Sequence, residues 1–352
     1  SGDYVNNAED ESAINLLIIT SGAEDGQAVT ATLNAATYTC SVSSNACTAS
    51  ITSAGLKGLT DGTAYTFSVA VSDAQGNAAT ADTSESFTYD ITAPTSTAAV
   101  LAVSGSGNGN NGDSITMTLT PSETVGTPTC TFADAAGDAL ANTVGYSTSG
   151  STHIATVAVA DDDADGAVTF SCTYTDTAGN AIASAITSAS SGSVTLDNTH
   201  PTSTAAVLAV SGSGNGNNGD SITMTLTPSE TVGTPTCTFA DAAGDALANT
   251  VGYSTSGSTH IATVAVADDD ADGAVTFSCT YSDLAGNAIA SAIVSASSGS
   301  ATLDNTHPSI SSVTFASGDY VNNAEDESAI NLVIVTSGAE DGQAVTATLN
   351  AA

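Results

Sequence analysis

The chain contains a stretch of 107 residues that occurs twice in succession. Residues 95–201 recur as residues 202–308, and the copies differ at four aligned pairs: Thr175/Ser282, Thr177/Leu284, Thr187/Val294 and Val194/Ala301. Nearly identical units in a row predict separate domains that share one role. Residues 1–36 also recur, as residues 317–352. We therefore predict domains at 1–94, 95–201 and 202–308, and a partial copy of the first domain at 309–352.

The two ends of the chain allow two interpretations. Residues 309–316 (SISSVTFA) are typical of a first strand and have no equivalent before Ser1, so we expect the domain at 1–94 to lack that strand. Either the sequence is a window from a longer periodic protein, or the piece at 309–352 completes the first domain of another chain by strand donation. Both interpretations stay open at this point.

Each unit ends in the pattern D-x-T-x-P, which occurs at Asp90–Pro94, Asp197–Pro201 and Asp304–Pro308. Proline fixes its own φ, keeps the preceding residue extended and withholds a backbone donor, so strand pairing must stop there. Such a segment favours a stiff joint over a flexible linker. The Asp and Thr of the pattern offer oxygen ligands at that joint.

Short alternating segments fill the space between these joints. In 95–201 they lie at 114–121, 127–132, 144–147, 153–160, 168–174 and 193–196. In the first domain they lie at 13–21, 28–34, 38–42, 46–51, 64–72 and 86–89. Alternation predicts half-buried strands, and the Gly, Asn, Asp and Ser runs between them predict turns. The sequence predicts no helix of useful length. It therefore predicts an all-β fold, with tandem immunoglobulin-like (Ig-like) β-sandwich domains in a linear array.

The charge of the chain excludes several kinds of partner. The net charge is −36, with one basic residue, Lys57, and no Arg. Nucleic-acid binding needs Lys and Arg at the phosphates, so we expect no nucleic-acid partner. No apolar run approaches the roughly 18 residues of a membrane span, so we expect no membrane insertion. Divalent cations, high salt or self-repulsion along an extended fibre would each accommodate this charge, and salt adaptation alone is the simplest alternative.

The six cysteines are regularly spaced. Cys130 and Cys172 recur one repeat later as Cys237 and Cys279, and Cys40 and Cys47 form a local pair. An even number paired within units indicates three disulfides, Cys40–Cys47, Cys130–Cys172 and Cys237–Cys279, and an oxidising compartment. Zinc is a poor alternative because there is no C-x-x-C and the histidines lie far away in sequence.

Acidic residues are predicted to gather at the joints. In an Ig-like sandwich the B–C and F–G loops share one pole with the incoming linker, which brings Glu123 and Asp176 to Asp90. Several carboxylates at one place repel unless a cation lies among them, and calcium accepts six to eight oxygen ligands. The candidate calcium ligands are linker Asp90, Asp197 and Asp304, loop Asp73, Asp176 and Asp283, and then Glu123 and Glu230. The alternative is that these aspartates only form turns.

Residues 2–94 resemble the bacterial Ig-like repeats of giant biofilm-associated surface adhesins. The matching stretches are GDYVNNAEDE (2–11), TSGAEDGQAVTATLNAATYT (20–39), LKGLTDGTAYTFSVAVSDAQGNAAT (56–80) and YDITAPT (89–95). The later units match less closely, through SITMTLTPSETV (114–125), TYTDTAGN (173–180) and LDNTHPT (196–202).

The resemblance implies an extracellular stalk of Ig-like domains that calcium stiffens at the joints. It adds four candidate ligands through its D-x-x-N-x-x-E phrase, namely Asp3 and Glu9 and their copies Asp319 and Glu325. One departure is Cys47, which stands where the family commonly has Trp. Tyr65 sits where a tyrosine corner is expected, with a plain core tyrosine as the alternative.

The function predicted from these features is structural. None of the four histidines has a nucleophile in a recognisable setting, so we expect no enzymatic activity. We expect an extracellular acidic stalk or fibre, at the cell surface or as a secreted filament, whose partners are neighbouring domains or copies of itself. The alternatives are a filament subunit joined by strand exchange between chains, and an adhesin module that binds a surface or glycan at an unseen tip.

Overall fold

The computed structural model describes residues 3–105, 107–212, 214–315, 331–339 and 342–348. The chain forms two compact units, residues 1–199 and 200–352. Regular structure is almost entirely β, which confirms the predicted class. The described part of the chain holds no helix with the length and apolar character that crossing a membrane requires.

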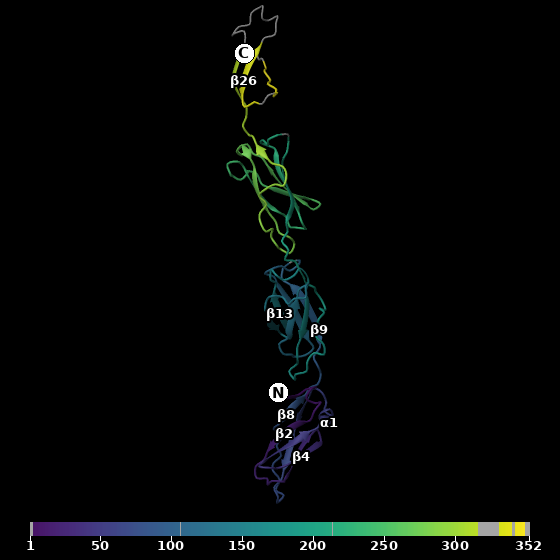
Figure 1. Cartoon of the computed structure of the whole chain (residues 1–352). Coiled ribbons are helices and arrows are strands. Elements are labelled where there is room, and N and C mark those ends of the chain that lie inside the picture. Colours follow the sequence, from purple (N-terminus) through teal and green to yellow (C-terminus); the bar gives the residue numbers. More distant parts are fainter. Residues whose placement is uncertain (1–2, 106, 213, 316–330, 340–341, 349–352) are drawn as a thin grey trace, which may run out of the picture. The chain divides into compact units, whose positions relative to one another are not determined.

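The first unit begins with a sandwich of short strands (Figure 1). They are β1 (Tyr4–Val5), β2 (Ile14–Ile19), β3 (Ala28–Leu33), β4 (Ala36–Ser41), β5 (Ala46–Ile51), β6 (Thr63–Thr66), β7 (Ser68–Val71) and β8 (Ser86–Tyr89). Three sheets form, in the orders β1-β8-β6, β2-β5 and β4-β3-β7. The alternation of apolar and polar residues along β3 explains why one face of this strand packs in the core. Val29, Ala31 and Leu33 are buried, while the residues between them are more exposed. The predicted strand at 64–72 divides at Phe67 into β6 and β7.

A single helical turn, α1 (Ser53–Leu56), follows β5. The Thr52 side chain caps it by accepting a hydrogen bond from the amide of Gly55, as N-cap residues do. Leu56 is fully buried in the core of this domain. The turn is too short to conflict with the prediction that no useful helix exists.

The second sandwich of the first unit has eight strands, two of which are labelled in Figure 1. They are β9 (Ser96–Val103), β10 (Ser114–Pro121), β11 (Thr129–Ala133), β12 (Gly145–Ser149), β13 (Thr152–Ala158), β14 (Gly166–Ala167), β15 (Thr169–Thr173) and β16 (Thr195–Leu196). A four-stranded sheet runs β12-β13-β10-β9, and two strand pairs, β11-β15 and β14-β16, accompany it. Ile115, Met117 and Leu119 of β10 are fully buried and centre the core. The sequence analysis missed β9.

The second unit repeats this sandwich with β17 (Ser203–Val210), β18 (Ser221–Pro228), β19 (Thr236–Ala240), β20 (Gly252–Ser256), β21 (Thr259–Ala265), β22 (Gly273–Ala274), β23 (Thr276–Thr280) and β24 (Thr302–Leu303). Its core again centres on three buried residues of one strand, Ile222, Met224 and Leu226. Beyond it lie β25 (Ser309–Phe315) and β26 (Leu332–Ser337), which pair antiparallel.

The three predicted disulfides are present. Cys130 on β11 and Cys172 on β15 are direct cross-strand partners, and Cys237 and Cys279 repeat this register. Cys40 on β4 bonds to Cys47 on β5. The tyrosine corner is also confirmed, because the Tyr65 hydroxyl accepts a hydrogen bond of 2.8 Å from the amide of Thr60.

Candidate metal centre

The linker after β8 is fixed by a carboxylate that the sequence analysis did not single out. Asp61 lies in the loop before β6, where it accepts a 2.7 Å hydrogen bond from the amide of Ile91 and another from the Thr92 hydroxyl. These hydrogen bonds, that from Thr92 above all, hold the pKa of the Asp61 carboxyl below its ordinary value. Asp61 therefore clamps the linker in its ionised form.

The same clamp recurs at the other two copies of D-x-T-x-P. Asp165 accepts from the amide of Asn198 and the hydroxyl of Thr199, and Asp272 accepts from the amide of Asn305 and the hydroxyl of Thr306. The threonine of the pattern, which we predicted to offer an oxygen ligand, is thus a hydrogen-bond donor that fixes the linker. The signal in the sequence was an Asp in a loop about 30 residues before each pattern.

The F–G loop of the second sandwich holds Asp176 in a tight turn. One oxygen of Asp176 accepts from the amides of Gly179 (2.7 Å) and Asn180 (2.8 Å), and the other accepts from the Asn180 side chain (2.9 Å). Asp283 makes the same turn in the second unit, and Asp73 makes it with Asn77 in the first domain. These aspartates therefore form the turns that their sequence favours, which by itself does not decide between turn formation alone and metal binding.

Asp176 nevertheless faces two other carboxylates. Asp90 of the linker, Glu123 after β10 and Asp176 after β15 each bring one oxygen within 4.8 Å of the others. The local pairing explains the approach, because Val125 and Asp176 form an isolated bridge and the amide of Gly126 donates to the carbonyl of Thr175. The predicted convergence of B–C loop, F–G loop and linker residues is what the first unit shows.

The pKa values of two of these groups reflect the crowding. Burial, followed by the charge of Asp176, raises the pKa of Asp90 above its ordinary value. Burial and then the charges of Asp176 and Asp90 raise the pKa of Glu123 in the same way. Ionising all three carboxylates is therefore unfavourable unless positive charge is supplied.

Asparagine side chains connect this cluster to the first sandwich. The Asn180 side chain donates to the backbone carbonyl of Asp90 (2.8 Å) and accepts from the amide of Asn7 (2.9 Å). The side chain of Asn6, the residue before Asn7 in the first sandwich, donates to the carbonyl of Ala178 (2.9 Å). The sequence analysis named neither Asn6 nor Asn180 as a functional residue, although Asn180 ends the stretch TYTDTAGN (173–180) that it quoted.

The residues at this joint fit a calcium ion. Three carboxylates supply hard oxygen ligands, while zinc would prefer cysteine or histidine. Calcium tolerates irregular coordination, so carbonyls of the surrounding loops suit it as further ligands, whereas magnesium demands near-octahedral geometry. Burial first, and then the neighbouring carboxylates, raise the pKa values of Asp90 and Glu123, and a bound cation would oppose both effects.

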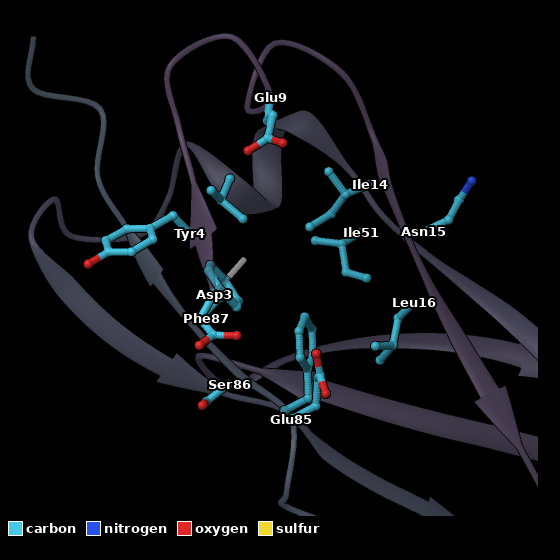
Figure 2. A pocket seen from close by; sticks show the side chains of 12 residues that line it. Asp3, Tyr4, Glu9, Ile14, Asn15, Leu16, Ile51, Glu85, Ser86 and Phe87 are labelled. Carbon is cyan, nitrogen blue, oxygen red and sulfur yellow. The ribbon is translucent and has the colours of Figure 1, made fainter. Parts of the chain in front are cut away.

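The other predicted ligands lie outside this cluster. Asp3 and Glu9 line a cavity of about 340 Å³ beside β2, where Glu9 accepts from the amide of Asn6. Figure 2 shows Glu9 and Asp3 on different sides of that cavity, with Ile14 and Ile51 turned into it. Asp73 lies instead near Glu24, which accepts from the amide of Ala74 at 2.9 Å.

Six predicted ligands belong to the later copies. Asp197 accepts from the amide of Thr199 in the first unit, while Glu230, Asp283 and Asp304 belong to the second. Asp304 is exposed and accepts from the amide of Thr306. Asp319 and Glu325 lie outside the described residues. For all of these, metal binding stays a prediction.

Comparison with known proteins gives structural neighbours only. No protein-family model matches the chain, and no curated protein matches it significantly. A structure from a 1.5-MDa bacterial ice-binding adhesin is 19% identical over 82% of this chain and 90% of that one, with a TM-score of 0.44. A tetra-tandem repeat from the extending region of a large adhesion protein is 18% identical over 94% and 85%, with a TM-score of 0.27. An I-band fragment of titin is 13% identical over 83% and 99%, with a TM-score of 0.32.

Proposed function

We propose that the chain is an extracellular structural repeat protein that forms a stiff, acidic stalk, as an adhesin extender or surface filament. Calcium at the joints between its domains stabilises the stalk. The observation that carries this proposal is the joint at Asp90, where the linker is hydrogen-bonded on both sides and three carboxylates meet. A flexible tether would need none of these contacts.

The hydrogen bonds at the joint support stiffness. Asp61 of the first sandwich holds Ile91 and Thr92, while Asn180 of the second sandwich holds the carbonyl of Asp90. Two further bonds run directly from Asn6 and Asn7 to the F–G loop. Bending at the linker would have to break several of these bonds together, so the joint favours one arrangement.

The charge of the chain supports the cation. With 37 acidic side chains against one basic side chain, the chain has almost no internal positive charge to offset its carboxylates. The first joint gathers three carboxylates in one place. A divalent cation bound there removes their repulsion and links residues of both sandwiches and the linker.

The disulfides support an extracellular location. Disulfides persist in oxidising compartments and are rare in the cytosol. Disulfides also add stability to domains whose cores bury little apolar area, and much of the interior here is built from the small side chains of Ala, Val and Cys. The resemblance of residues 2–94 to biofilm-associated adhesin repeats points to the cell surface.

Small-angle X-ray scattering of the full chain tests the proposal. We expect the maximum dimension and apparent stiffness to fall when calcium is removed by a chelator and to recover when calcium is returned. The variant Asp90→Asn, Glu123→Gln, Asp176→Asn should lose most of this response at the first joint. Its control replaces three exposed aspartates, Asp138, Asp161 and Asp162, with Asn, which changes the net charge equally.

A scattering profile that does not change when calcium is chelated would contradict the proposal of a calcium-stiffened stalk. An equal response in the cluster variant and its control would contradict the assignment of the site to Asp90, Glu123 and Asp176.

A further inference from the structure

Strand β12 forms an open edge of the four-stranded sheet in the second sandwich. It pairs with β13 on one side, and among the described residues no strand pairs with its other side. All five of its residues, Gly145–Ser149, are exposed. Its copy, β20, has the same place in the sheet of the second unit. The chain therefore presents the same open edge twice.

Three other strand edges of this sandwich are covered. The backbone of residues 190–191 bonds along β9, and Ile186 exchanges two backbone hydrogen bonds with Cys172 of β15. At β11, the Tyr146 hydroxyl accepts from the amide of Cys130 (2.9 Å) and donates to its carbonyl (3.3 Å). The open edge of β12 thus differs from its neighbours within the same domain.

The hairpin between β12 and β13 determines which backbone groups of the open edge are free. Gly150, with a φ of 61°, begins the two-residue turn after Ser149, as a type II′ turn requires. Ser149 flanks this turn and therefore exchanges backbone hydrogen bonds with β13, and such pairs alternate along an antiparallel ladder. Ser147 bonds to β13 in the same way, whereas the amides and carbonyls of Tyr146 and Thr148 point away from it. Within the described residues these four groups have no backbone partner.

The edge carries no charge, although the chain is strongly acidic. Residues 139–160, which include β12 and β13, contain no Asp, Glu, Lys or Arg, and neither does their copy at 246–267. Native proteins usually protect an open edge with charged side chains, with proline or with a covering segment. The 37 acidic residues lie elsewhere in the sequence. A second chain of the same net charge can therefore approach this edge without meeting a carboxylate on the strand itself.

The free backbone groups are placed so that a second copy of the strand satisfies them. When two copies of β12 lie antiparallel about Ser147, Tyr146 of each lies opposite Thr148 of the other. Each of these two pairs exchanges two backbone hydrogen bonds, so every free group of both edges is used. A register centred on Tyr146 or on Thr148 instead pairs the other of the two with a residue beyond the end of the strand.

The antiparallel direction also separates the nearest carboxylates. Glu123 lines a cavity beside Thr148, at one end of the edge. Antiparallel pairing sets the two copies of Glu123 at opposite ends of the contact, whereas parallel pairing would set them at the same end. Charge therefore favours the two-fold, isologous arrangement.

We infer that two copies of the chain associate side by side through β12, and likewise through β20. The contact joins two four-stranded sheets into one sheet of eight strands, by strand addition between copies. A copy that is bound through one of its two edges still has the other, so association continues beyond a pair. The contact uses backbone groups and no cation, so its test can fail while the proposed calcium-stiffened stalk stands, and the reverse.

Analytical ultracentrifugation of the full chain tests the association. At an ionic strength of about 0.15 M, salt screens long-range repulsion, while directly opposed charges still interact. We expect the average mass of the wild type to rise with concentration. The variant Ser147→Asp, Ser254→Asp sets like charges opposite each other at the centre of the contact and should weaken association about tenfold or more.

The matched control is Ala102→Asp, Ala209→Asp. It adds the same charge at exposed positions of β9 and β17, the strands at the covered edge, and should change association little. All four substituted positions are exposed, so we expect the two variants to fold alike, which their thermal unfolding checks.

Crosslinking tests the register. Ser147 would face its own copy as a pair without mutual backbone hydrogen bonds, whose Cα atoms lie about 4.5 Å apart, a separation that a disulfide spans. Under mild oxidation, Ser147→Cys should therefore give a disulfide-linked dimer, and Ala102→Cys should give little. A wild-type chain that stays monomeric at all concentrations overturns the inference. So does equal weakening by the two Asp variants, or an equal yield of dimer from the two Cys variants.

Discussion

At the scale of single residues, the Asp61 clamp is the contact most open to a direct test. Replacing Asp61 with Ala removes acceptors from the amide of Ile91 and the hydroxyl of Thr92. A net hydrogen bond contributes about 0.5–1.5 kcal/mol, so we expect hydrogen exchange at the Ile91 amide to accelerate about two- to tenfold. Asp25→Ala is the control, because Asp25 holds the Ser44 amide elsewhere in the domain. Unchanged exchange at Ile91 would show that the linker is held by other contacts.

Glu123 allows a prediction about pH. Its pKa is raised in the folded chain, so the folded state favours the protonated form. The stability this provides is complete below the ordinary carboxylate pKa and is lost as pH rises through the raised value. Without divalent cations, Glu123→Gln should therefore unfold at a higher temperature than the wild type near neutral pH, by about 1–2 °C. The two should converge at acid pH.

Calcium should reverse this order. With the ion bound, the ionised Glu123 carboxylate becomes a ligand and the Gln variant loses it. Thermal unfolding of the wild type and the Gln variant, measured once with chelator and once with calcium, tests both expected orders of stability. A Gln variant that is less stable under both conditions at neutral pH would show that Glu123 is not under electrostatic stress.

The acidic residue types, together with the predicted Ig-like topology, could locate part of this site. The Ig-like topology was enough to bring Asp90, Glu123 and Asp176 together, because loop order fixes which loops share a pole. It could not reveal Asp61 or Asn180, since their roles depend on which backbone amide each oxygen reaches. The same limit explains Thr92, which looked like a ligand and acts as a donor.

At the scale of strands and turns, alternation predicted most of the fold. Strand β10 shows why: its buried and half-exposed residues alternate over eight positions. Strand β9 escaped prediction because its sequence, STAAVLAV, is small and apolar on both faces, without clear alternation. The helical turn α1 was not predicted either, because four residues are too few to establish a helical period.

The disulfides differ in the length of chain that they close. Cys130 and Cys172 are 42 residues apart, and Cys40 and Cys47 are 7 apart. In the chain-entropy model the longer loop contributes about 4 kcal/mol and the shorter about 2.5 kcal/mol. We therefore expect the double replacement Cys130→Ala, Cys172→Ala to lower the free energy of unfolding of its domain more than Cys40→Ala, Cys47→Ala does. Denaturant titration of the two variants compares them, and a reversed order would show that local strain or packing dominates.

At the scale of the whole molecule, the net charge of −36 calls for an explanation. Self-repulsion of this size destabilises compact states and keeps chains apart in solution. Salt adaptation and specific cation binding both relieve it, and they differ in their dependence on ion type. Screening of the repulsion between carboxylates depends on ionic strength alone, whereas a binding site made of carboxylates selects cations by their charge and size.

Thermal unfolding at matched ionic strength separates these two explanations. If the joints bind calcium, low concentrations of calcium should raise the unfolding temperature of the domains beside them, and the rise should saturate. Sodium chloride at the same ionic strength should give a smaller, gradual rise. The variant Asp90→Asn, Glu123→Gln, Asp176→Asn should lose part of the calcium-specific rise and keep the response to sodium, because it removes one site and little of the total charge. If calcium and sodium act alike at equal ionic strength, the carboxylates at the first joint are turn residues in an acidic protein, and the stiffness of the joint rests on Asp61, Asn180 and proline.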